Sequence, residues 1–143
     1  MADPAVQVHR WEDIVVGQTA SLSVTLTPDV VAAFAKLTGD VNPLHMSSEF
    51  AKEKGFKDRL AHGLLVSAFF SAIAGTMLPG RDCILHYARF DYKKPVFVGT
   101  ALTLEAKVVQ KVEAFKVMML EISARDAEGQ LVLGGRLQAG VLA

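Results

Sequence analysis

The sequence predicts an α+β fold in which a curved, five-stranded antiparallel sheet wraps around one long central helix. Three observations indicate this fold: an apolar segment at residues 63–77, one alternating segment before it, and four strand-like segments after it. Strands joined by short connections pair antiparallel, and a sheet with one apolar face buries that face against another layer. The length of 143 residues fits one domain, 1–143.

The first strand is expected at residues 20–27, where apolar and polar residues alternate with the period of a half-buried strand. A short helix should follow, because Thr27 can cap it, Pro28 suits its first position and Asp29 favours its first turn. Gly39 should end this helix, since glycine readily adopts the left-handed conformation found after helix C-termini.

Residues 40–45 are expected to form an irregular loop, because Pro43 lacks an amide hydrogen and disfavours helical angles just before it. Ser47 or Ser48 can then cap a second short helix that runs to Lys54. The two short helices would form an overhang that carries the loop.

The central helix is expected at residues 63–77, and apolar side chains surround it on all sides. Such a helix is buried on most sides. The strands that follow are expected at residues 83–92, 101–111, 115–125 and 130–142, with each run paired to its neighbour in sequence.

Composition excludes several classes of protein. Hydrophobic residues make up 51% of the chain, which excludes a disordered tail, and 15 basic residues balance 15 acidic ones. This balance gives no global field to attract nucleic acid or an anionic membrane. The longest apolar stretch, residues 63–78, is shorter than the roughly 20 residues that span a bilayer. With no signal-peptide pattern and a single cysteine, Cys83, we expect a cytoplasmic protein without a disulfide.

Residues 34–71 contain the most informative pattern. Two segments within this range carry the pattern, GDVNPLH at 39–45 and AHGLL at 61–65. A third segment, FDYKKPVFVG, lies later in the chain at 90–99. Together they resemble the MaoC-like, (R)-specific enoyl-CoA hydratase family of the hotdog-fold superfamily. The resemblance implies a hotdog fold and the reversible hydration of trans-2-enoyl thioesters to (R)-3-hydroxyacyl thioesters.

Asp40 and His45 are the expected catalytic pair. Hydration needs groups that transfer protons near neutral pH, and histidine and a carboxylate both serve. On a helix the two side chains would point to different faces, whereas a loop made rigid by Asn42 and Pro43 lets them meet at one water molecule. Each has a structural alternative: an exposed turn residue for Asp40, and a hydrogen-bonded structural histidine for His45.

Gly63 is the third expected catalytic residue. Free amides at a helix N-terminus stabilise developing negative charge on an oxygen, and the resemblance implies that the amide at the His-Gly position binds the thioester carbonyl. His62 is expected to hold a backbone group or pack at the mouth of the helix, near the substrate but without a catalytic role.

Further substrate-binding residues are expected around this site, and Asn42 and His62 are among them. Ser71 lies two turns after Gly63 and should line the acyl pocket or form a hydrogen bond near the catalytic pair, unless its hydroxyl bonds back to its own helix. Four basic residues are candidates for the phosphates of coenzyme A or of a phosphopantetheine arm, with a solvated surface as the alternative: Arg59, Arg89, Lys93 and Lys94. Histidine and acidic residues lack metal-ligand spacing, so no metal site is expected.

Two other functions remain open. A hotdog thioesterase would also use a carboxylate or histidine beside a helix N-terminus, and a non-catalytic acyl-thioester-binding subunit would work in a heteromeric dehydratase. No separate cofactor is expected, because coenzyme A or phosphopantetheine is part of the substrate. The open edge of a five-stranded sheet predicts a homodimer or a dimer of dimers, and an acyl-carrier protein is a candidate partner.

Overall fold

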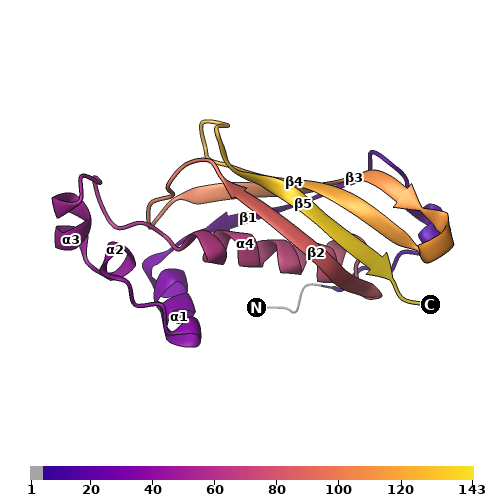
Figure 1. The fold of residues 1–143 in the computed structure, drawn as a ribbon, viewed down its shortest axis with the longest axis horizontal. Helices are drawn as coiled ribbons and strands as arrows, with labels where there is room; N and C mark the ends of the chain where they lie inside the picture. The colour runs from indigo at the N-terminus through magenta and orange to yellow at the C-terminus, as the bar shows by residue number, and fades with distance from the viewer. Residues whose placement is uncertain (1–4) are drawn as a thin grey trace.

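One antiparallel sheet and one central helix make up the body of the computed structural model, which describes residues 5–143 (Figure 1). The strands are β1 (Thr19–Thr25), β2 (Cys83–Tyr92), β3 (Ala101–Val112), β4 (Val117–Arg125) and β5 (Leu131–Val141). The helices are α1 (Pro28–Thr38), α2 (Pro43–Met46), α3 (Ser48–Glu53) and α4 (Gly63–Ala72), and the π-helical segment η2 (Ile73–Met77) continues α4. Two short 3-10 segments are η1 (Trp11–Asp13) and η3 (Glu113–Phe115).

The strand order is β1-β3-β4-β5-β2, and every neighbouring pair is antiparallel. The expected pairing of consecutive strands is confirmed for β3 with β4 and for β4 with β5. It is wrong for β2 and β3, which lie in different parts of the sheet. The segment between them does not form a hairpin, because it bonds to the approach to α4, where the Ala61 amide donates to the Val96 carbonyl at 2.7 Å.

The core lies between α4 and the sheet (Figure 1). Strands β3 and β4 alternate between exposed or half-buried and fully buried residues, so each presents one apolar face. Leu104 and Leu120 from this face belong to one buried cluster with Phe70 and Ile73 of the helical segment. Each such side chain contributes roughly 1.5–3 kcal/mol when it leaves water, and this packing fixes α4 against the sheet.

Helix α4 is less buried than its sequence predicts. Leu65, Val66 and Phe70 are buried, but Leu64 is 65% exposed and Ser71 is also exposed. The expectation of burial on most sides is therefore wrong for the single chain. The reason is geometric, since one sheet covers one side of a helix and leaves the opposite side open.

Helices α1, α2 and α3 lie beyond one end of the sheet and form the expected overhang (Figure 1). Helix α1 begins as predicted, with the Thr27 hydroxyl accepting from the Val30 amide, and Gly39 ends it at φ +80°. Only the first half of the expected irregular loop, residues 40–42, is non-helical. The second half is the single turn α2, because the Asn42 side chain caps it and Pro43 suits its first position.

Helix α3 is fixed by both serines that were expected to compete for its cap. The Ser47 hydroxyl accepts from the Phe50 amide and is the cap, whereas the Ser48 hydroxyl donates to the Asp58 carboxylate at 2.6 Å. This bond, together with one from the Arg59 amide, holds the pKa of the Asp58 carboxyl below its ordinary value. Within residues 5–143, no helix is long and apolar enough to cross a membrane.

Candidate active site

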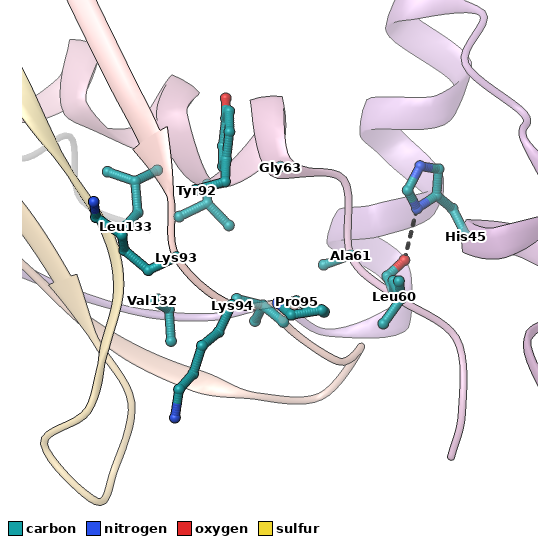
Figure 2. Close-up of a pocket in the computed structure, with 12 residues that line it drawn as sticks. His45, Leu60, Ala61, Gly63, Tyr92, Lys93, Lys94, Pro95, Val132 and Leu133 are labelled. Carbon is teal, nitrogen blue, oxygen red and sulfur yellow. Dashed lines mark hydrogen bonds between the residues drawn. The ribbon is translucent and has the colours of Figure 1, made fainter. Parts of the chain in front are cut away.

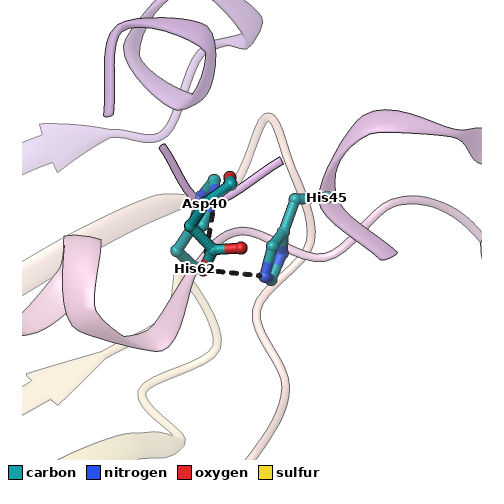
Figure 3. A group of neighbouring side chains, drawn as sticks. All are labelled: Asp40, His45 and His62. Carbon is teal, nitrogen blue, oxygen red and sulfur yellow. Dashed lines mark hydrogen bonds and ion pairs between the residues drawn. The ribbon is translucent and has the colours of Figure 1, made fainter. Parts of the chain in front are cut away.

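The Asp40 carboxylate faces the His45 ring across a narrow gap (Figure 3). Gly39 turns the chain out of α1, and the Asp40 amide then donates to the Thr38 hydroxyl at 3.2 Å. One carboxylate oxygen, Oδ1, accepts from the Asn42 amide at 3.2 Å. The other, Oδ2, lies 3.9 Å from His45 Nε2. The loop therefore brings together the two side chains that the sequence pairs.

The orientation of the His45 ring is set by a backbone carbonyl. Its Nδ1 lies 2.8 Å from the Leu60 oxygen, and because a carbonyl only accepts, Nδ1 must carry the hydrogen. In the neutral ring the lone pair is then on Nε2, the atom that faces Asp40. The 3.9 Å gap is longer than a hydrogen bond, so a water molecule beside the gap can bond to both groups.

His62 supports both members of this pair. The side chain is 2% exposed, and its Nε2 donates to the Asp40 carbonyl at 2.9 Å. Its ring stacks on His45 with centroids 3.8 Å apart and planes at 29°, while Phe34 packs 4.9 Å away. His62 thus holds a backbone group, as expected, and also forms a wall behind the His45 ring. It does not line the cavity described below.

These three side chains also form a group whose possible metal-ligating atoms lie within 4.8 Å of one another: Asp40, His45 and His62. The hydrogen bonds favour proton transfer over metal binding. His62 Nε2 carries the hydrogen that it donates to the Asp40 carbonyl, and metal ligation requires a free lone pair. A metal bound through His62 Nε2 would have to break the bond that holds the loop to the helix.

Gly63 provides the first amide of α4 and lines a cavity of about 380 Å³ whose wall also includes His45 (Figure 2). No side chain caps this end of the helix, and the first amides of a helix lack intrahelical partners. A Cβ atom at position 63 would lie 2.9 Å from Cε1 of Tyr92, so a larger residue here would require the tyrosine ring to move. The cavity is lined by His45, Leu60, Ala61, Gly63, Val66, Tyr92, Lys93, Lys94, Pro95, Val96, Val132 and Leu133.

Of the four basic residues, Lys93 and Lys94 line this cavity. Arg59 lies at the overhang, where a guanidinium nitrogen donates to the His45 carbonyl at 3.3 Å. Arg89 pairs with Asp91 at 2.9 Å and lines a different, polar hollow. The structure thus brings two of the four to the wall of the apolar cavity, while phosphate binding by any of them remains a prediction.

The remaining predicted residues take positions other than the cavity wall. Asn42 caps α2 by accepting from the Leu44 amide at 2.9 Å, a structural role that keeps the loop in shape. Ser71 lies on the exposed side of α4 and does not line the cavity within the single chain. Its contact with an acyl group remains a prediction.

Sequence reasoning missed Ser67 and Tyr92. The Ser67 hydroxyl is buried in α4 and lies 2.6 Å from the Tyr92 hydroxyl, whose ring forms part of the cavity wall. A signal existed for the serine, because positions four residues apart share a helix face and Ser67 follows Gly63 by one turn. No local pattern indicates that the end of β2 brings Tyr92 to the same place.

The two histidines are expected to hold opposite tautomers when neutral. The Leu60 carbonyl fixes the hydrogen of His45 on Nδ1, and the Asp40 carbonyl fixes that of His62 on Nε2. Nitrogen-15 chemical shifts of the imidazole rings at alkaline pH will distinguish the two forms. The same tautomer for both rings would contradict this hydrogen-bond scheme, and exposed His86 serves as the control.

Comparisons with known proteins identify the family and the fold. The MaoC like domain family matches residues 14–128. The chain is 36% identical to an (R)-specific enoyl-CoA hydratase of Rhodospirillum rubrum, over 90% of this chain and 88% of that protein. It is also 36% identical to an (R)-specific enoyl-CoA hydratase of Aeromonas caviae, over 87% and 92% of the two chains.

A solved structure described as the (R)-hydratase from A. caviae involved in PHA biosynthesis superposes with a TM-score of 0.88. The sequence identity is 34%, and the match covers 91% of this chain and 98% of that one. The expected hotdog fold is therefore confirmed. On sequence and structure together, the chain belongs to the MaoC-like domain family.

Proposed function

We propose that this protein catalyses the reversible hydration of trans-2-enoyl thioesters to (R)-3-hydroxyacyl thioesters. The observation that carries the proposal is the Asp40–His45 pair, whose histidine lines the same apolar cavity as Gly63 at the start of α4. Its named relatives include (R)-specific enoyl-CoA hydratases and a 3-hydroxybutyryl-CoA dehydratase, all hydro-lyases, and the chain is an enzyme of that class. Relatives acting on acyl-carrier-protein substrates also match, so both kinds of thioester are candidates.

In the hydration direction, Asp40 and His45 bind one water molecule that lies beside the gap between Oδ2 and Nε2 and bonds to both atoms. The pair removes a proton from this water as its oxygen bonds to C3 of the enoyl group. The electrons of the C2–C3 double bond move toward the thioester carbonyl, and C2 then takes a proton from the pair. One proton leaves water and one reaches C2, so the pair returns to its starting state without a separate cofactor.

The Gly63 amide acts on the other end of the reacting group. As C3 gains its oxygen, negative charge develops on the thioester oxygen, and a fixed N–H donor stabilises that charge. The amide belongs to the first turn of α4, where the helix dipole is also favourable for an anion. Because α4 is fixed by the core, this donor needs no rearrangement during the reaction.

Loss of either member of the pair should lower turnover strongly. Asp40→Asn and His45→Gln keep the size and hydrogen-bonding capacity of each side chain but remove its proton-transfer function. We expect each to reduce kcat by about 10²–10⁴-fold, the usual contribution of general acid–base catalysis. The measurement is the loss of absorbance of crotonyl-CoA, whose conjugated thioester disappears on hydration.

Asn42→Asp is a suitable control for a change of charge near the loop, because Asn42 caps α2 and an aspartate caps a helix equally well. Crotonyl-CoA, longer enoyl-CoA and carrier-protein substrates should all be tried. The proposal fails if the wild-type protein hydrates none of them, and release of free thiol without hydration would identify a thioesterase instead.

Lys93 and Lys94 are proposed to bind the phosphates of coenzyme A or phosphopantetheine. Both line the cavity that Gly63 and His45 share, and the Lys94 ammonium also donates to the Gln130 side-chain oxygen. Charge reversal to Lys93→Glu and Lys94→Glu should raise KM on the order of tenfold and leave kcat within a factor of two. This estimate follows because unit charges 4 Å apart interact by about 1 kcal/mol even in water.

The control is the pair Lys36→Glu and Lys107→Glu, which makes the same change in net charge at exposed positions outside the cavity. Steady-state kinetics with crotonyl-CoA at low and high salt will separate a local contact in the cavity from a general effect of net charge, because salt screens exposed charges. An unchanged KM in the cavity variant would remove both lysines from the proposed site.

A second copy of the chain is the proposed partner. Strand β2 is an edge of the sheet, and Ile84 and Leu85 on it are each 44% exposed. Helix α4 also leaves Leu64 open to solvent. An unpaired edge with apolar side chains readily pairs with another strand, so two sheets joined at β2 would cover these groups.

Sedimentation equilibrium should therefore give at least twice the mass of one chain. Ile84→Lys places a charge on the proposed contact and should shift the protein toward the monomer. Phe115→Lys, at a position that is 77% exposed on η3, should keep the wild-type mass. A wild-type protein that sediments as a monomer at micromolar concentration would contradict the proposal.

A further inference from the structure

We propose that Tyr92, held in place by Ser67, determines which acyl groups the site accepts by excluding branches at C2. The inference rests on the proposed hydratase function and names the class of substrate more closely, as thioesters unbranched next to the carbonyl. It is based on a hydrogen-bonded chain, a steric contact and a cavity that all meet at Gly63.

The hydrogen-bonded chain fixes the position of the Tyr92 hydroxyl. Ser67 Oγ donates to the Gly63 carbonyl at 3.3 Å and lies 2.6 Å from the Tyr92 hydroxyl. A hydroxyl has one hydrogen to donate. The hydrogen of Ser67 is used toward Gly63, so Tyr92 is the donor in the shorter bond. Since Ser67 is only 5% exposed, the tyrosine hydroxyl is tied to the buried side of α4.

The steric contact places the Tyr92 ring against Gly63 itself. A Cβ atom built on Gly63 would lie 2.9 Å from Cε1 and 3.1 Å from Cδ1 of the ring. The ring therefore occupies the space beside the first residue of α4 and also forms a wall of the cavity (Figure 2). If the Gly63 amide binds the thioester oxygen, this ring forms part of the cavity wall beside the carbonyl carbon and C2.

The position of the reacting atoms explains why the restriction falls on branching. The thioester oxygen is held at Gly63, and C3 must face the water bound by Asp40 and His45. C2 lies between these two fixed points, so a methyl group on C2 projects into the space beside the carbonyl, where the ring stands. The far end of a straight acyl chain extends away from both points and does not meet the ring.

The serine has a clear function in this arrangement. Tyr92 is 50% exposed, and a half-exposed ring that is held by packing alone can change rotamer readily. The hydrogen bond to a buried partner holds the ring over Gly63. Phenylalanine would fill the same volume but would lack this restraint.

The experiment compares kcat/KM for trans-2-butenoyl-CoA with that for (E)-2-methyl-2-butenoyl-CoA in the wild type and in Tyr92→Ala. The wild-type ratio includes the lower intrinsic reactivity of the branched substrate. The change in the ratio between wild type and variant therefore measures the steric effect of the pocket. We expect the variant to shift the ratio toward the branched substrate by at least about tenfold, the lower bound for one methyl group in a pocket. The ratio of trans-2-octenoyl-CoA to trans-2-butenoyl-CoA should change by less than about threefold, below that bound.

Tyr87→Ala is the matched control, because Tyr87 lies on the same strand, is 49% exposed and does not line the cavity. Its ratio should equal that of the wild type. Tyr92→Phe removes only the hydrogen bond between Tyr92 and Ser67, whereas Ser67→Ala removes that bond and also the bond from Ser67 to the Gly63 carbonyl. Each should shift the branched-substrate ratio by roughly two- to tenfold, the value of one hydrogen bond, and the double variant should shift it no further.

The inference is overturned if Tyr92→Ala leaves the branched-to-straight ratio unchanged while the wild type hydrates trans-2-butenoyl-CoA. A shift in chain-length preference instead of branching would overturn it as well. Absence of hydration in the wild type is a different result, because it removes the proposed function and this inference with it.

Discussion

The hydrogen bond from His62 Nε2 to the Asp40 carbonyl joins the two halves of the candidate site. Asp40 belongs to the loop of the overhang, whereas His62 immediately precedes α4, which the core fixes against the sheet. The bond is buried at its donor end, where an unpaired polar group would cost about 1–3 kcal/mol. This bond therefore holds Asp40 in a fixed position relative to the same helix that presents the Gly63 amide.

The same histidine also sets the position of His45. Their rings stack at 3.8 Å, and the Leu60 carbonyl fixes the other side of the His45 ring at Nδ1. Leu60 and His62 belong to one short segment that leads into α4. Three groups with different roles, a carboxylate, an imidazole and an amide, are therefore positioned by one stretch of chain and the helix that follows it.

Much of the fold was predictable because its boundaries are local. Gly39 and Thr27 delimit α1 as expected, and the turn residues between the later strands gave bounds within two residues of those observed for β2 to β5. The pairing of β2 was not predictable by the same means. Its partner is β5, which is distant in sequence, and the choice depends on bonds between the β2–β3 connection and the approach to α4.

In the candidate site, too, features within one short segment were predictable and features that join distant segments were not. The meeting of Asp40 and His45 follows from a short loop, and the motif at residues 39–45 indicated it. The stacking of His62 on His45 and the contact of Tyr92 with Gly63 join residues from different elements, so neither leaves a pattern in the local sequence. The roles of the basic residues were harder still to predict from sequence. Arg89 and Lys93 are close in sequence, yet Arg89 forms an ion pair with Asp91.

A double-variant cycle on turnover would test most directly whether Asp40 and His45 act on one shared water molecule. Residues that act as a unit are strongly non-additive. If the account is correct, the variant carrying both Asp40→Asn and His45→Gln will lose no more kcat than the more impaired single variant, within about threefold. A double variant whose loss equals the product of the two single losses would show independent action and contradict the account.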